Sequence, residues 1–129
     1  MERIFLILSG IFGFLGVALG AFGAHALRAH LEKLPDGVKR AEWWETASRY
    51  HLIHALAIAV AAYVAGRAPG GASTAAGFCF AGGILLFSGS LYIMTLTGIR
   101  GLGAVTPFGG LLMMAGWIAT VIAALRLGK

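Results

Sequence analysis

Four histidines are the residues of this chain whose side chains are best suited to chemistry. His25 ends the first long apolar run and His30 follows it, and His51 and His54 begin the second. His51 and His54 are three residues apart, so on a helix they share roughly one face. In an up-down hairpin His25 would lie opposite them at the same depth. Converging imidazoles could hold a metal ion or a haem, although no spaced ligand motif such as HExxH accompanies them.

Basic and hydrogen-bonding residues accumulate at the same end of the predicted helices. Arg28 lies three residues after His25, and Arg100 lies in the loop after the third apolar run. Such a polar cap could hold a lipid headgroup phosphate or a quinone carbonyl. The alternative, which we favour, is that these groups only hydrogen-bond helices and loop together. The candidate ligand-binding residues are His25, Arg28, Tyr50, His51, His54 and Arg100.

The acidic residues exclude two function classes. All five lie outside the apolar runs: Glu2, Glu32, Asp36, Glu42 and Glu45. Cation-coupled transporters usually hold a carboxylate within the membrane, and intramembrane aspartyl proteases need two. Ser88-Gly89-Ser90 lacks the GxSxG elbow of serine hydrolases. We therefore predict no enzymatic activity and no catalytic residue, and our leading interpretation includes neither a metal nor a cofactor.

Composition determines which elements must position these residues. Of the 129 residues, 59% are hydrophobic and only 12% are charged, and the mean hydropathy is +0.86. Soluble domains are about 45–50% apolar and about 25% charged. The net charge of +5 comes from scattered basic residues rather than from a stripe with interleaved aromatics, so nucleic acid is not an expected partner. Cys79 is the single cysteine and cannot form an intrachain disulfide.

Four uncharged runs predict four membrane spans, at about 4–27, 50–66, 76–97 and 107–125. The first corresponds to about 36 Å of helix, long enough to cross a bilayer and longer than the core of a signal peptide, so we expect it to be retained. Thr106 is predicted to cap the fourth helix, with Pro107 as its first residue. The polar segment 28–49 turns at Pro35-Asp36-Gly37 and becomes helical near Val38. The prediction is a single all-α domain, 1–129: an up-down four-helix bundle with a polar, partly helical loop between the first two spans and both termini on one side.

Small residues recur at spacings of three and four along the first span, with Gly16 and Gly20 forming GxxxG. Helices in a bilayer associate through close backbone approach, which such stripes permit. Packing within the bundle is the first interpretation, and contact with a second copy is the alternative. The predicted helix-packing residues are Gly13, Gly16, Gly20, Gly23, Gly89 and Gly110.

Four strings carry a family resemblance: GVALGAFGAHALR (16–28), YHLIHALAI (50–58), FSGSLYIMTLTG (87–98) and TPFGGLLMMAGW (106–117). They resemble the domain of unknown function 423 family of small membrane proteins, which includes transmembrane protein 256. The resemblance touches all four spans in order. It implies a multi-pass protein of the bacterial inner membrane with no assigned activity, and it supplies no catalytic residues. Ten polar, proline or glycine positions within these strings are marked by the resemblance: His25, Arg28, Tyr50, His54, Ser88, Ser90, Tyr92, Thr106, Pro107 and Gly110.

The functional expectation is a structural or accessory component of the membrane. Its partners would be the lipid bilayer and either further copies of itself or a larger membrane complex. The alternative is a binder of haem, metal, quinone or a lipid headgroup that uses the cluster of His25, His51 and His54. The lack of an Arg- and Ser-rich presequence favours a bacterial source over an imported mitochondrial one.

Overall fold

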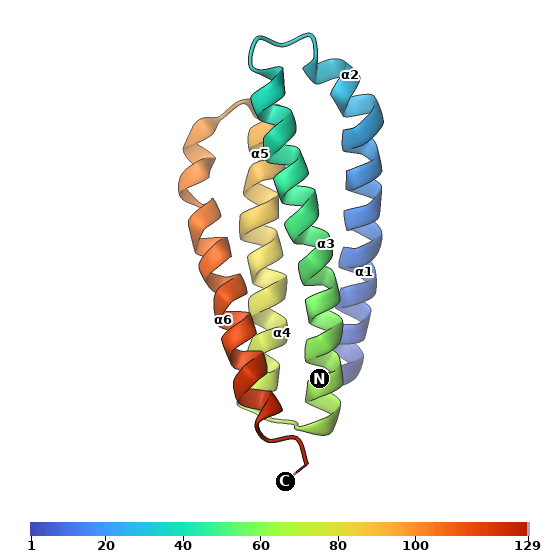
Figure 1. The fold of residues 1–129 in the computed structure, drawn as a ribbon, viewed down its shortest axis with the longest axis vertical. Helices are drawn as coiled ribbons and strands as arrows, with labels where there is room; N and C mark the ends of the chain where they lie inside the picture. Colours follow the sequence, from blue (N-terminus) through green and yellow to red (C-terminus); the bar gives the residue numbers. More distant parts are fainter. Residues whose placement is uncertain (129) are drawn as a thin grey trace.

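The computed structural model describes residues 1–128 as four long antiparallel helices (Figure 1). The first comprises α1 (Glu2–Phe22), a π-helical turn η1 (Gly23–Leu27) and α2 (Arg28–Leu31), and the second is α3 (Gly37–Arg67). The third comprises α4 (Gly71–Gly83), a second π-helical turn η2 (Ile84–Ser88) and α5 (Gly89–Thr97). A short 3-10 helix, η3 (Arg100–Ala104), leads into α6 (Thr106–Ala124). Each of the four helices is long and apolar enough to cross a membrane.

The four-helix prediction is confirmed, and Figure 1 shows α3 between α1 on one flank and the α4–α5 helix on the other. The chain ends lie together at the lower end of the bundle. The first helix is the most apolar, with a mean hydropathy of 2.4 in its best window, and only 11% of that window is buried. It packs along α3 and reaches α4 through Phe5, so most of its surface is left to face lipid.

Two predicted helix starts are wrong, for local reasons. The third helix begins at Gly71 rather than near Ala76, because Gly70 makes the turn in an extended conformation and the Ser73 hydroxyl bonds back to its carbonyl. Thr106 does not cap α6, since Val105 precedes the helix and the Thr106 hydroxyl lies 2.6 Å from Oγ of Ser90. The helix after the polar turn begins at Gly37, one residue before the predicted Val38.

Glycine and alanine allow the helices to approach closely around a few large side chains. Phe5, Ile58 and Phe80 are fully buried, mainly among alanines of α3 and α4. A Cβ at Gly77 would overlap the Phe5 ring, and a Cβ at Gly116 would overlap the Phe80 ring. Dispersion contacts at such short range, rather than hydrophobic exclusion from water, hold membrane helices together.

The two π-helical turns lie next to interhelical hydrogen bonds. Trp44 Nε1 donates to the carbonyl of Leu19, just before η1, over 2.9 Å. In η2 the Ser88 hydroxyl donates to the carbonyl of Ala47 over 2.8 Å. A π turn breaks the regular backbone pattern and rotates the residues that follow it. Both turns therefore adjust how the first and third helices pack against α3.

Candidate functional site

His54 connects two helices in the bundle interior and uses both ring nitrogens. Nδ1 lies 2.8 Å from the carbonyl of Tyr50, which can only accept, so Nδ1 carries the proton. Nε2 is then an acceptor and receives the indole N–H of Trp117 over 3.3 Å. The Tyr50 ring stacks nearly parallel to the imidazole, 6.0 Å between centroids. A metal or haem iron would have to displace one of these bonds.

His51 is buried one helical turn away and has different partners. Its Nδ1 lies 3.1 Å from the Tyr92 hydroxyl, and the Phe12 ring approaches edge-on with centroids 5.8 Å apart. Its Nε2 is the buried side-chain atom that lacks a partner within residues 1–128. The neighbours on that side are Phe12 and Gly16 of α1, so the nitrogen faces a tight helix contact.

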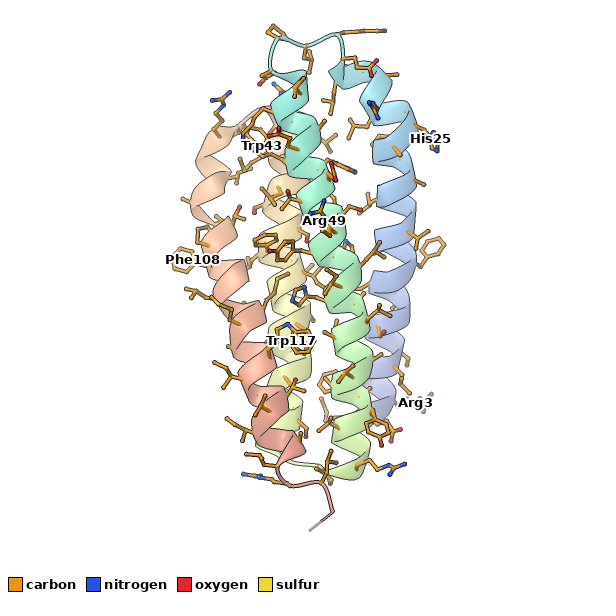
Figure 2. All side chains as sticks on the ribbon, viewed as in Figure 1. Arg3, His25, Trp43, Arg49, Phe108 and Trp117 are labelled. Carbon is orange, nitrogen blue, oxygen red and sulfur yellow. The ribbon has the colours of Figure 1, made fainter. Side chains whose placement is uncertain are left out.

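His25 does not join the other two histidines, which corrects the predicted three-histidine cluster. It is exposed and points away from the bundle at the end of the first helix (Figure 2). Gly23 and Leu27 are the residues of its turn that pack inward, and a residue two positions after Gly23 lies on nearly the opposite face. Within residues 1–128, no three His, Cys, Asp or Glu side chains are grouped closely enough to hold a metal ion.

The two arginines of the predicted cap engage separate partners. Arg28 pairs with Glu32 over 3.3 Å on the exposed side of α2, whereas the Arg100 guanidinium lies 5.9 Å from the centre of the Trp43 ring. A third arginine, Arg40, ties the loop to the bundle by bonding Asp36 over 3.0 Å and the carbonyl of Thr95 over 3.3 Å.

Asp36 is the acidic partner in that tie and lies in the loop outside the spans. The hydrogen bond from Arg40 holds the pKa of the Asp36 carboxyl below its ordinary value, with smaller electrostatic contributions from Arg40 and Arg100 and an opposing one from desolvation. The folded loop therefore favours the ionised form of the Asp36 carboxyl over the protonated form.

The predicted packing glycines divide into two groups. A Cβ at Gly16 would lie 2.7 Å from a Leu52 methyl, one at Gly20 would lie 3.0 Å from Ser48 Oγ, and one at Gly23 would overlap the Trp44 indole. These three hold α1 against α3. A Cβ at Gly13 or Gly89 would meet nothing within 4 Å, and one at Gly110 would make only ordinary contact with Phe87.

A concave feature lies between the end of the first helix and the first half of α3. It is a groove of about 700 Å³. Its inner wall is apolar, formed by residues such as Leu27, Trp44 and Leu52, and its rim carries Arg28 and Arg49 among several glutamates. Arg28 is one of the predicted ligand-binding residues, whereas Arg49, which forms a 2.8 Å ion pair with Glu45, is not.

The partners of the two buried histidines were not predicted. Trp117 lies well inside α6 and Tyr92 inside α5, both on helices remote in sequence from α3. One sequence signal was available, because the indole N–H of a tryptophan deep in a span usually needs an acceptor. Its identity depends on helix rotation, which the sequence pattern did not determine.

The comparisons with known proteins agree with this architecture. The family model described as "Protein of unknown function (DUF423)" matches residues 19–110. The UPF0382 membrane protein YwdK of Bacillus subtilis is 46% identical over 125 residues, covering 96% of this chain and 98% of that protein. The UPF0382 inner membrane protein YgdD of Escherichia coli is 38% identical over 128 residues, covering 99% and 94%. No solved structure matches the chain significantly. The chain is a multi-pass membrane protein and belongs to the DUF423 family, for which no biochemical activity is assigned.

Proposed function

We propose that the protein is a non-enzymatic structural or accessory component of the bacterial inner membrane. The observation that carries this proposal is the use of the buried polar groups to join helices. Both nitrogens of His54 are occupied, Ser88 bonds the backbone of α3, and Ser9 of α1 bonds the carbonyl of Ala55. The buried polar residues of the interior described are histidines, serines and a threonine, with no carboxylate among them.

Two features support lateral association with a second copy or with a larger complex. The first helix contacts its own bundle along one side only. On that helix Gly13 is half-buried, and a Cβ added there would meet nothing within 4 Å. A flat, small position on a lipid-facing helix permits another helix to approach closely. Its lack of intramolecular packing distinguishes Gly13 from Gly16 and Gly20.

Disulfide cross-linking in native membranes tests self-association. With Cys79→Ser as background, Gly13→Cys should give an oxidised dimer, whereas Phe14→Cys, on a different face of the same turn, should not. Equal cross-linking of both variants would indicate random collision. If neither variant cross-links to itself and a photoreactive group at residue 13 traps no neighbour, the proposal is wrong.

The inner-membrane location is supported by the Escherichia coli relative, which is an inner membrane protein by name, and is tested separately. A fluorescent fusion and membrane fractionation should place the protein with inner-membrane markers. Recovery with the outer membrane would contradict the proposal.

A further inference from the structure

The groove between α1–α2 and α3 lies where the membrane changes from hydrocarbon to headgroups. Trp43 and Tyr63 are twenty residues apart on α3 (43 to 63), about 30 Å, which is the usual thickness of the hydrocarbon core. Aromatic residues of this kind favour the two interfaces, and Arg67 stacks on Tyr63 at 5.0 Å at the far end. The groove extends along α3 from Leu52 to Val38 and so crosses the Trp43 level.

Arg49 lies at the edge of the second predicted span, on the side of Trp43 that faces the middle of the bundle. It is six residues from Trp43 along α3, about 9 Å toward the membrane interior. Ser48, the residue before Arg49, contacts Gly20 on the facing helix. Gly20 lies within the run 4–27, which has no charged residue. Figure 2 shows Arg49 near the middle of the long axis, well below the level of His25.

Other parts of the protein leave the Arg49 side chain and its partner Glu45 largely exposed. The side chains of Arg49 and Glu45, paired over 2.8 Å, are 63% and 72% exposed. A charged side chain near the hydrocarbon is costly unless it reaches polar groups, and arginine does so by extending its guanidinium toward the headgroups. The exposed Glu45–Arg49 pair therefore favours a polar occupant on the lateral face of the bundle.

The rim charges indicate the chemistry of that occupant. Two arginines, Arg28 and Arg49, line the groove together with three glutamates, Glu32, Glu42 and Glu45. An anionic headgroup would meet the arginines but also three carboxylates. A zwitterionic headgroup presents a phosphate and an ammonium, and each has partners of opposite sign here.

We propose that this groove binds one phospholipid with a primary-ammonium headgroup. The phosphate lies against the guanidinium of Arg49 and within reach of Arg28, and the ammonium lies against the carboxylates of Glu42 and Glu45. The upper part of an acyl chain follows the apolar wall toward Leu52. A volume of about 700 Å³ holds a headgroup, its glycerol and the first part of a chain, and the remaining hydrocarbon continues into the bilayer.

The site is independent of the association proposed above, because a single copy supplies every residue that it uses. Native mass spectrometry of the intact protein from mild detergent tests it with three added lipids of identical acyl chains: phosphatidylethanolamine, phosphatidylcholine and phosphatidylglycerol. We expect one retained phosphatidylethanolamine, preferred by about fivefold or more over the other two. Arg49→Gln should weaken its retention by about tenfold, as expected for the loss of a charge-assisted contact.

Arg100→Gln is the control, since it removes a guanidinium at the same end of the bundle, beside Trp43, but outside the groove. It should leave lipid retention unchanged. Glu45→Gln should reduce the preference for phosphatidylethanolamine over phosphatidylcholine, because a primary ammonium donates hydrogen bonds that a quaternary one cannot. Ala24→Trp adds a large ring to the groove lining and leaves every charged residue in the sequence unchanged, and it should abolish retention even if Arg49→Gln fails to fold.

Three outcomes would overturn the proposal. The first is equal or better retention of phosphatidylglycerol, which would show that the glutamates do not select the headgroup. The second is equal loss in Arg49→Gln and Arg100→Gln, which would indicate only a general effect of charge. The third is a lipid-free dimer that Ala24→Trp dissociates, which would show that a second copy covers the groove.

Discussion

Nε1 of Trp117 donates a hydrogen bond to Nε2 of His54 across 3.3 Å and joins α6 to α3 inside the bundle. The opposite side of the same imidazole donates to Tyr50 of its own helix. The Tyr50 carbonyl can only accept, so it keeps the proton of His54 on Nδ1. Nε2 is therefore unprotonated and can accept the hydrogen bond from Trp117. His54 is therefore a structural connector between the second and fourth spans.

Replacing Trp117 with Phe keeps an aromatic ring against Phe80, whose centroid lies 5.0 Å from that of Trp117. It removes the donor and leaves Nε2 of His54 without a partner. We expect a loss of about 1–2 kcal/mol in the free energy of unfolding, measured by denaturant titration in micelles. Trp43→Phe, at the membrane interface, should cost less. Equal losses in the two variants would contradict the role assigned to His54.

Gly109 and Gly13 form a matched pair of helical glycines. A Cβ at Gly109 would overlap the backbone of Phe87, coming within 2.7 Å of its Cα, and backbone atoms cannot move aside as side chains do. Gly109→Ala should therefore separate α6 from η2 and destabilise the protein by about 1–3 kcal/mol. Gly13→Ala, which meets nothing within 4 Å, should be neutral or stabilise by up to about 1 kcal/mol through helix propensity. Thermal unfolding of both in detergent provides the comparison.

The same pair distinguishes packing within the chain from packing between chains. If Gly13→Ala leaves the monomer stable but weakens cross-linking at that face in membranes, Gly13 contacts a second copy. If Gly13→Ala destabilises the monomer as much as Gly109→Ala does, the contacts described for α1 are incomplete.

Ser88 is completely buried, and its hydroxyl donates to the carbonyl of Ala47 on α3. Ser88→Ala should cost about 0.6 kcal/mol, the average for an interhelical hydrogen bond in a membrane protein. Ser88→Val should cost more, because an added methyl group must fit a filled interior. Thr97→Ala is the control, since the exposed Thr97 hydroxyl bonds only nearby backbone, donating to the carbonyl of Ile93 and accepting the N–H of Ile99, and joins no second helix. SDS-induced unfolding measures all three.

Acid should loosen the loop between the first two spans. Because Arg40 lowers the pKa of Asp36 in the folded protein, the pair stabilises the folded form above the ordinary value of 3.8. That contribution disappears as the pH falls through the lower pKa of the folded state. The protection factors of amides at the start of α3, which correct the exchange rates for their intrinsic pH dependence, should therefore fall on acidification toward pH 3.

Asp36→Asn should show faster exchange already at pH 7 and less additional change on acidification. Glu32→Gln alters a solvent-exposed pair on α2 instead and should not change the exchange of α3. An unchanged acid response in Asp36→Asn would mean that another group controls the loop.

Hydropathy was sufficient to predict four helices, their order and the common side of the termini, because uncharged runs of this length have few alternatives in a membrane. Helix rotation was harder to predict. His25 was expected beside His51, yet it points outward, because the first span contacts α3 through Gly23 and Leu27. Thr106 carried the signature of a cap, yet its hydroxyl bonds Ser90, a residue whose position depends on the π turn before it. Sequence periodicity assumes regular helices and does not include such turns.

The one-sided attachment of the first helix has a consequence for biogenesis. A span of mean hydropathy 2.4 that is 11% buried enters the bilayer and remains stable there without its neighbours. It leaves the ribosome first and can wait as a lone helix while the remaining spans are synthesised. Packing against α3 then needs only lateral movement in the bilayer. The side chains of Leu52, Ser48 and Trp44 of α3 come to lie against Gly16, Gly20 and Gly23 respectively. We therefore expect the first helix to pack against α3 by moving sideways within the membrane, after both helices have already been inserted.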